Sequence, residues 1–201
     1  MSGVAKLACI DLEGVLVPEL WPTLAVRTGI HELFATTREL PDYDALMRQR
    51  IDLLRQHGMT LSDVQRITRT IRPFSGAAGF LQALRDRGYE VQIISDCFHE
   101  LADSMLRALG RPTIFCHSLT TDSEGFISGC DYYRRRDKEE HVNQAQVDGL
   151  HVLAVGDALN DIAMLRRADQ GFLVNPSITT LAAAPDLQAV ENLEEVIKRI
   201  A

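Results

Sequence analysis

One ten-residue segment, VLAVGDALND at positions 152–161, limits what this chain can fold into more than any other feature. An apolar run typical of a buried strand leads directly into Gly156, and Asp157 and Asp161 follow at a predicted strand-to-helix turn. Clustered carboxylates repel each other unless a hard cation such as Mg2+ holds them. The segment therefore predicts a cation or phosphate site at a strand end, although these acids could also simply cap the helix expected near Leu159.

A second segment, VAKLACIDLEG at 4–14, has the same design. Its apolar run ends at Asp11 and Glu13, immediately before Gly14. In open α/β sheets, ligands bind beyond the carboxyl ends of the strands. Helix capping would explain one of these acids but not two pairs on two strands. The two acidic strand ends therefore predict one shared site.

Strand-like and helix-like runs alternate along most of the chain. Strands are predicted at 4–10, 90–94, 113–116, 151–155 and 171–174. Helices are predicted at 98–109, 138–147, 159–167 and 193–200, and a small hairpin at 119–128. This alternation predicts an α/β fold with a doubly wound parallel sheet.

Residues 16–72 depart from this alternation and show helical periodicity alone, at 19–27, 43–56 and 61–70. The segment from Thr60 to Asp63 resembles a capping box, and Pro73 with Gly76 marks the return to the sheet. We therefore expect a core domain of residues 1–15 and 73–201. A helical cap, residues 16–72, would be inserted after the first strand and would lie over the site.

Composition and charge exclude several classes of partner. Among 201 residues, 21 Lys and Arg face 28 Asp and Glu, which gives a formal net charge of −7, and the one basic run is at 134–138. We expect no extended nucleic-acid groove and no membrane span. The four cysteines have no CxxC or zinc-ligand spacing, and the first residues do not resemble a signal peptide. A reduced, cytoplasmic protein is the expectation.

Four motifs resemble, in order, those of the haloacid-dehalogenase-type phosphatases. They are DLEGV at 11–15, the strand VQIISD that carries Ser95, then Lys138, and GDALND at 156–161. One such motif would be weak evidence, but four in the right order, each at a plausible strand end or helix start, are strong. The resemblance covers nearly the whole chain. It implies a Rossmann-like core and phosphoryl transfer through an aspartyl phosphate.

The resemblance also implies catalytic roles. Asp11 would be the nucleophile, and Ser95 and Lys138 would stabilise charge on the phosphoryl oxygens. Glu13 stands where these phosphatases usually carry an Asp that protonates the leaving oxygen and activates water. The longer side chain shifts the reach of this carboxyl by roughly one C–C bond, and a misplacement of about 1 Å can cost on the order of 100-fold in rate. Glu13 is thus the one departure from the motif.

Mg2+ is the cofactor that the resemblance implies. Its ligands would be the carboxylates of Asp11 and Asp157 and the backbone carbonyl of Glu13. Asn160 and Asp161 would orient the waters of the metal and the catalytic lysine. Asn160 would also contact the substrate.

The predicted cap resembles that of phosphoserine phosphatases, through VLVPELW at 15–21 and LMRQRIDLL at 46–54. In that family a Glu meets the substrate ammonium and an Arg meets its carboxylate, and Glu19 and Arg50 would carry these roles here. Taken without the resemblance, Glu19 could be a first-turn acid beside a helix dipole and Arg50 a solvated arginine.

A narrower resemblance is to the bifunctional phosphoserine phosphatase/homoserine phosphotransferases of bacteria. It rests on DLEGVLVPE, TTREL followed by PDYD, MRQR, and SDCF followed by HELA. It implies small-molecule substrates, O-phosphoserine as donor and water or homoserine as acceptor, for a monomer or homodimer without nucleic-acid or membrane partners. Two alternatives remain: a phosphatase for another small phosphomonoester, and a regulatory domain that is phosphorylated on Asp11 to switch a partner.

Overall fold

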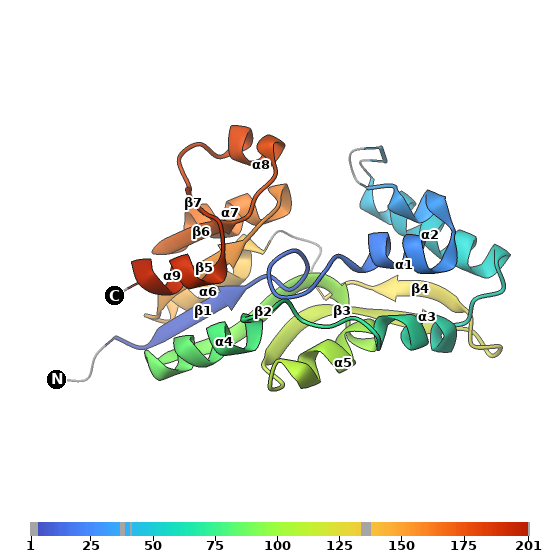
Figure 1. The fold of residues 1–201 in the computed structure, drawn as a ribbon, viewed down its shortest axis with the longest axis horizontal. Coiled ribbons are helices and arrows are strands. Elements are labelled where there is room, and N and C mark those ends of the chain that lie inside the picture. Colours follow the sequence, from blue (N-terminus) through green and yellow to red (C-terminus); the bar gives the residue numbers. More distant parts are fainter. Residues whose placement is uncertain (1–3, 37–38, 41, 134–137, 201) are drawn as a thin grey trace.

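A seven-stranded sheet forms the centre of the molecule in the computed structural model, which describes residues 4–36, 39–40, 42–133 and 138–200 (Figure 1). The strand order is β4-β3-β2-β1-β5-β6-β7. All neighbouring strands pair in parallel except β3 and β4, which form the predicted hairpin. This confirms the α/β fold expected from the sequence. The strands are β1 (Lys6–Ile10), β2 (Tyr89–Phe98), β3 (Thr113–Thr121), β4 (Ile127–Asp131), β5 (His151–Gly156), β6 (Gln170–Val174) and β7 (Gln188–Val190).

Helices follow most of the strands. After β1 come α1 (Leu20–Thr28), the short 3-10 helix η1 (His31–Phe34), α2 (Tyr43–Gln56) and α3 (Leu61–Thr68). The others are α4 (Ala77–Asp86), α5 (His99–Ala108), α6 (Glu139–Val147), the 3-10 turn η2 (Leu159–Asp161), α7 (Ile162–Arg167), α8 (Ile178–Ala183) and α9 (Leu193–Arg199). The sequence did not predict α4, α8 or β7. Within the described ranges, no helix is long and apolar enough to cross a bilayer.

The central strands are buried on both faces. Along β1, Ala8 and Ile10 enter a large apolar cluster that includes side chains from α4, α5 and α9, while Leu7 and Cys9 enter a smaller cluster with α6 and α7. A parallel strand covered by helices on both faces needs apolar residues at consecutive positions. This is why the sequence shows a continuous apolar run, and why the polar side chains gather at the strand end.

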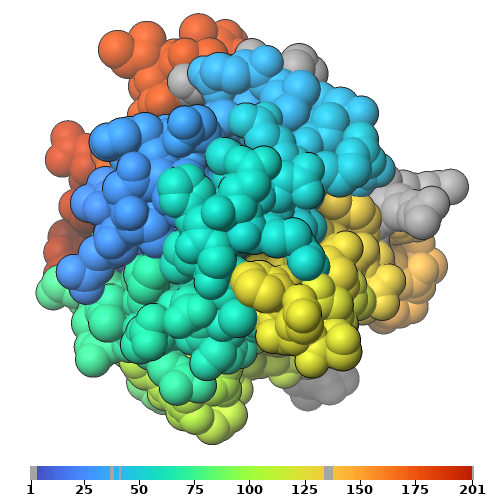
Figure 2. All heavy atoms as spheres, turned by 90° about the vertical axis from the view of Figure 1, so that its right-hand side faces the viewer, coloured from blue at the N-terminus to red at the C-terminus, as the bar shows by residue number. Residues whose placement is uncertain are grey.

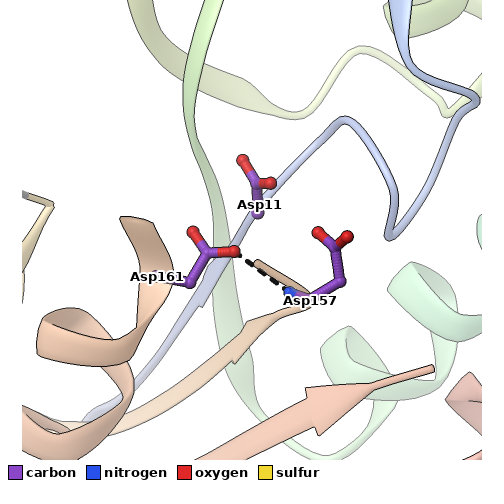
Figure 3. Close-up of side chains that lie close together, drawn as sticks. All are labelled: Asp11, Asp157 and Asp161. Atoms are coloured by element: carbon purple, nitrogen blue, oxygen red, sulfur yellow. Dashed lines mark hydrogen bonds between the residues drawn. The ribbon is translucent and has the colours of Figure 1, made fainter. Parts of the chain in front are cut away.

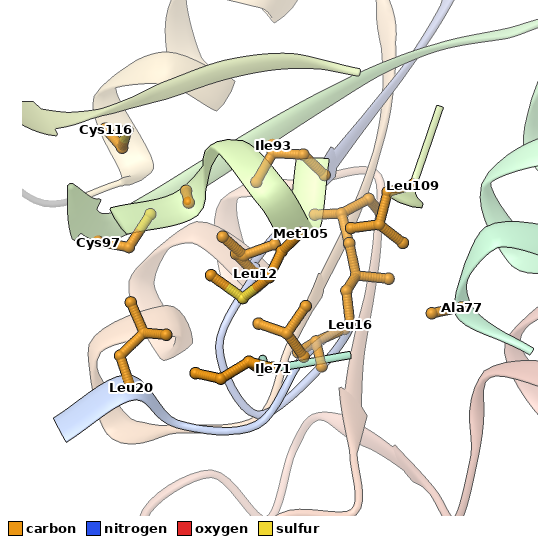
Figure 4. Close-up of a cluster of buried hydrophobic side chains, with 14 of the residues drawn as sticks. Leu12, Leu16, Leu20, Ile71, Ala77, Ile93, Cys97, Met105, Leu109 and Cys116 are labelled. Carbon is orange, nitrogen blue, oxygen red and sulfur yellow. The ribbon is translucent and has the colours of Figure 1, made fainter. Parts of the chain in front are cut away.

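The helices α1, α2 and α3 lie beyond the carboxyl ends of the central strands, and this helical segment rests on the hairpin and on α5 (Figures 1 and 2). Arg55 at the end of α2 forms a salt bridge with Asp122 of the β3–β4 loop. Leu61 at the start of α3 donates its amide to the carbonyl of Gly125 in the same loop, at 2.9 Å. Leu16, Leu20 and Ile71 pack with Ile93 and Met105 in the large cluster (Figure 4). The helical segment and the sheet therefore share one apolar core.

Candidate active site

Strand pairing brings the predicted acids together. β1 and β5 are parallel neighbours with Ile10 beside Val155, and the amide of Asp11 continues the ladder by donating to the Val155 carbonyl at 2.9 Å. Asp157 follows β5 directly. One carboxylate oxygen each from Asp11, Asp157 and Asp161 lies within 4.8 Å of the others (Figure 3). The three side chains thus form one acidic cluster at the carboxyl edge of the sheet.

Two glycines make room for this acidic cluster. A β-carbon on Gly156 would lie 2.5 Å from the side chain of Asp161, and one on Gly14 would lie 2.4 Å from Oδ2 of Asp157. Gly14 also has φ +78°, in the left-handed region that favours glycine. The glycines of the two motifs therefore let carboxylates approach the backbone closely.

Lys138 joins the acidic cluster from the start of α6. Its buried ammonium donates to Oδ1 of Asp11 and to Oδ1 of Asp161, both at 2.7 Å. Burial alone would lower the pKa of Lys138, but the carboxylates of Asp11 and Asp161 outweigh it and hold that pKa well above its ordinary value. Lys138 is therefore a fixed positive charge against the carboxylate of Asp11.

The acidic cluster still has unused acceptor capacity at Asp157. Both oxygens of Asp161 are engaged, since Oδ1 accepts from Lys138 and Oδ2 accepts from the amides of Asp157 and Ala158 at 3.0 and 3.2 Å. Oδ1 of Asp157 is buried and has no hydrogen-bond partner. Burial and then the carboxylate of Asp161 raise the pKa of Asp157 to about 7. A buried, unpartnered oxygen beside other acids fits a hard cation such as Mg2+, which these carboxylates could hold.

Glu13 is half-buried and contacts the first helix after β1. Its Oε2 accepts from the amide of Leu20, the first residue of α1, at 2.8 Å. Burial raises the pKa of Glu13 to about 7, and the Leu20 amide opposes that shift. The carboxyl can therefore hold or release a proton near neutral pH, as a general acid and base must.

Ser95 lies two residues beyond Ile93, which pairs with Ile10 of β1, and Asn160 directly precedes Asp161. The predicted second strand ends at position 94, just before Ser95, but β2 continues to Phe98, and its pairing with β3 shifts register between Ile94 and Phe98. Ser95 is buried, and its Oγ accepts from the amide of Cys97 at 3.3 Å. Asn160 donates its side-chain amide to Oδ2 of Asp96 at 2.8 Å, a contact the sequence did not predict.

Arg50 and Glu19 come from the helical segment. Arg50 on α2 is only 7% exposed, and its Nη2 donates to the carbonyl of Ala35 at 3.0 Å, while its buried Nε has no partner. Burial lowers the pKa of Arg50, and nearby Tyr43 and the carboxylates of Glu13 and Glu19 oppose that shift. Glu19 is exposed and directly precedes α1. The charges of Arg50, Glu19 and Glu13 thus act on one another.

Sequence reasoning missed two residues of this region. Asp96 accepts from Asn160, and its other oxygen lies 3.7 Å from Nε2 of His117. Trp21 packs its ring against the guanidinium of Arg50, 4.4 Å from ring centroid to Cζ. Trp21 lies two residues after Glu19, and this closeness in the sequence could have marked it as part of the site. The contact of Asp96 with Asn160 joins separate elements and leaves no local sequence pattern.

Comparisons with known proteins show the family of the chain. The family described as haloacid dehalogenase-like hydrolase matches residues 5–169. The chain is 40% identical over 193 residues to a phosphoserine phosphatase of Pseudomonas syringae pv. tomato, which covers 96% of this chain and 81% of that protein. It is also 40% identical over 191 residues to phosphoserine phosphatase ThrH of Pseudomonas aeruginosa, with 95% and 93% covered.

A solved structure, described as a phospho-aspartyl intermediate analogue of phosphoserine phosphatase, matches with a TM-score of 0.81. The match covers 99% of this chain and 100% of that one, at 24% identity. At this identity the likeness is one of fold alone.

Proposed function

The chain belongs to the haloacid dehalogenase-like hydrolases, and we propose that it is a Mg2+-dependent phosphoserine phosphatase that works through a phosphoaspartate on Asp11. The observation that carries this proposal is the pair of 2.7 Å contacts from Lys138 to Asp11 and Asp161, beside the unpartnered oxygen of Asp157. The names of the two relatives at 40% identity support the choice of phosphoserine.

In the first half-reaction, a carboxylate oxygen of Asp11 attacks phosphorus, and the bond from phosphorus to the serine oxygen breaks. Glu13 gives its proton to the departing serine oxygen, a role that fits its pKa of about 7. Lys138 and Ser95 stabilise the charge on the phosphoryl oxygens. Mg2+, held by Asp11, Asp157 and the Glu13 carbonyl, would supply further positive charge at those oxygens.

In the second half-reaction, Glu13 takes a proton from water, whose oxygen attacks phosphorus and releases phosphate from Asp11. We further propose that the homoserine hydroxyl can replace water, which makes the protein a phosphotransferase as well. The sequence resemblance to the bifunctional enzymes, including Glu at position 13, supports this activity, as does the 40% identity to the relative named ThrH.

We assign substrate recognition to the helical segment. Arg50 would pair with the carboxylate of phosphoserine through its unpartnered Nε, since an arginine edge suits a planar anion. Glu19 would meet the substrate ammonium, and Asn160 would contact the substrate at the edge of the site. Residues 16–72 would thereby act as the cap of a core made of 1–15 and 73–201. In this role the protein would serve serine and threonine biosynthesis in the cytoplasm, as a monomer or homodimer.

The test is 31P NMR of the purified protein with Mg2+, O-phospho-L-serine and L-homoserine in one tube. We expect inorganic phosphate and phosphohomoserine together. Inorganic phosphate alone would refute the transferase, and an unchanged spectrum would refute phosphoserine as the substrate and direct the search to other phosphomonoesters. Asp11→Asn should reduce both products to the level of buffer, whereas Asp131→Asn, at an exposed aspartate ending β4, should leave them unchanged.

A further inference from the structure

Trp21 of α1 and Arg50 of α2 form a buried cation–π pair. Each residue is only 7% exposed, and the guanidinium carbon of Arg50 lies 4.4 Å from the centroid of the Trp21 ring. An arginine over the face of tryptophan is a favourable cation–π arrangement, and it is stronger when water is excluded. The ring therefore provides a surface on which a desolvated guanidinium can remain charged.

The other contacts of this guanidinium leave its Nε without a hydrogen-bond partner. Nη2 donates to the Ala35 carbonyl at 3.0 Å, and Nη1 lies 3.7 Å from the sulfur of Met47, while the buried Nε has no partner. The contact with the ring and the hydrogen bond to the carbonyl together hold the guanidinium in place. Its Nε is then the donor that an acceptor from a ligand would satisfy.

The charges near Arg50 explain why the contact of its guanidinium with the Trp21 ring matters. Glu13 and Glu19 both oppose the downward shift of the Arg50 pKa, so both carboxylates lie within electrostatic reach of the guanidinium. A long arginine side chain without the indole surface would be free to turn toward these acids. An ion pair with Glu13 or Glu19 would neutralise the guanidinium charge that is proposed to bind the substrate carboxylate.

We propose that Trp21 is a positioning residue for substrate specificity, which holds the Nε edge of Arg50 toward the substrate carboxylate. The inference rests on the proposed phosphoserine phosphatase activity. It adds that the selectivity for a carboxylate-bearing phosphomonoester depends on the indole of Trp21 as well as on the arginine. Trp21 acts through Arg50 and makes no contact with the phosphoryl group in this role.

A double-mutant cycle on phosphoserine hydrolysis tests this role. Trp21→Leu should raise KM about 3- to 30-fold with kcat little changed, a range that corresponds to the usual strength of a cation–π pair. Trp21→Phe, which keeps a ring, should recover part of the loss. In an Arg50→Met background, Trp21→Leu should change kcat/KM no further. Independent, multiplicative effects in that background would overturn the inference, whereas a wild-type protein inactive on phosphoserine would overturn the proposed function instead.

A matched pair outside the site controls for simple loss of packing. Arg55 lies over the ring of Phe126 at 5.0 Å, where the end of α2 meets the hairpin. Phe126→Leu removes the same type of interaction, so it should lower the melting temperature but leave KM for phosphoserine unchanged. An equal rise of KM in Phe126→Leu and Trp21→Leu would attribute the effect to general destabilisation and contradict the proposal.

The indole also reports on the pair directly, because Trp21 is the only tryptophan in the sequence. In an Asp11→Asn background, which prevents turnover, phosphoserine should change the tryptophan emission. O-phosphoethanolamine lacks the carboxylate and should leave the emission unchanged. Its concentration should be raised until calorimetry shows saturation, or to the limit of its solubility. The phosphoserine signal should disappear in Arg50→Met. Bound phosphoserine without a change in emission, or equal changes with both ligands, would contradict the proposed role of Trp21.

Discussion

Gly156 is the residue on which the acidic cluster depends most directly. A β-carbon there would lie 2.5 Å from Asp161, whose carboxylate is completely buried and holds both Lys138 and two backbone amides. Such a close approach forces the Asp161 side chain to shift, and its other oxygen, Oδ1, is the one that accepts from Lys138. The effect of a single methyl group should therefore reach the ammonium beside Asp11.

We predict that Gly156→Ala lowers kcat on the order of 100-fold and destabilises the protein by about 1–3 kcal/mol, the usual costs of a small displacement in a catalytic site and of overpacking. Steady-state kinetics and urea unfolding would measure the two effects. Gly79→Ala on α4 is the matched control, since a β-carbon there meets nothing within 4 Å. It should keep full activity and gain up to about 1 kcal/mol from helix propensity. Wild-type kcat in Gly156→Ala would refute the assignment of Asp161 and Lys138.

The sequence was most informative about residues whose positions are set by the strand that they follow. Asp11 and Asp157 each follow a buried strand, so the pairing of β1 with β5 was enough to predict their meeting. Asp96 shows the limit of this reasoning, because its partners Asn160 and His117 reach it from other elements. Such contacts depend on how helices and strands pack, which local periodicity does not encode.

At the level of elements, the missed helices show two different reasons for failure. In α4 the buried residues Ala77, Phe80, Leu81 and Leu84 have regular helical spacing, but Gly76 and Gly79 weaken the helical signal. In α8 the spacing of apolar residues does not match the buried face of the helix, since Thr180 is buried while the larger Ile178 is exposed. The predicted bounds of α2 were correct because its caps and periodicity agree.

Arg166 links α7 to the segment after α8 and gives this part of the fold a pH dependence. Its Nε and Nη2 contact the two oxygens of Asp186 at 2.9 and 2.7 Å, and these hydrogen bonds lower the pKa of Asp186 to about 2. The pKa of an unfolded aspartate is about 3.9. A carboxyl whose pKa is lower in the folded state stabilises that state above the unfolded pKa, and the contribution is lost as pH falls from about 4 through 2.

We therefore expect Arg166→Met to be less stable than wild type at pH 6, and the difference in unfolding free energy to shrink as pH falls to 3. Asp186→Asn should show the same convergence. Urea unfolding at a series of pH values would measure both variants. A constant difference across this range would show that Arg166 stabilises the fold by packing instead of by charge.

On the scale of the whole molecule, several polar contacts hold α2 and α3 of the proposed cap to the hairpin and to α5. The end of α2 and the start of α3 are tied to the β3–β4 loop, and Gln65 of α3 donates to the Glu100 carbonyl of α5 at 3.0 Å. The contacts of α1 with the site run through Glu13 and Arg50. Closure over a ligand should therefore move α1 and η1 more than α3.

Hydrogen exchange with and without Mg2+ and orthovanadate, a phosphate analogue, would test this asymmetry. We expect added protection of amides in α1 and η1 and little change in α3. In Arg55→Met, which lacks the salt bridge to Asp122, exchange in α3 should become sensitive to the ligand. Equal protection of all three segments in the wild type would indicate that the cap closes as one rigid unit.

The apolar core shared by the helical segment and the sheet bears on how new specificities can be engineered. Leu16, Leu20 and Ile71 are buried against Ile93 and Met105, so a transplanted cap from another phosphatase would need a matching apolar underside as well as a new binding surface. Exchange of whole caps should mostly yield insoluble chimaeras. Single substitutions at Trp21, Tyr43 and other residues around Arg50 change far less of that underside than a cap exchange does, so they are the better starting point for directed evolution toward other phosphomonoesters.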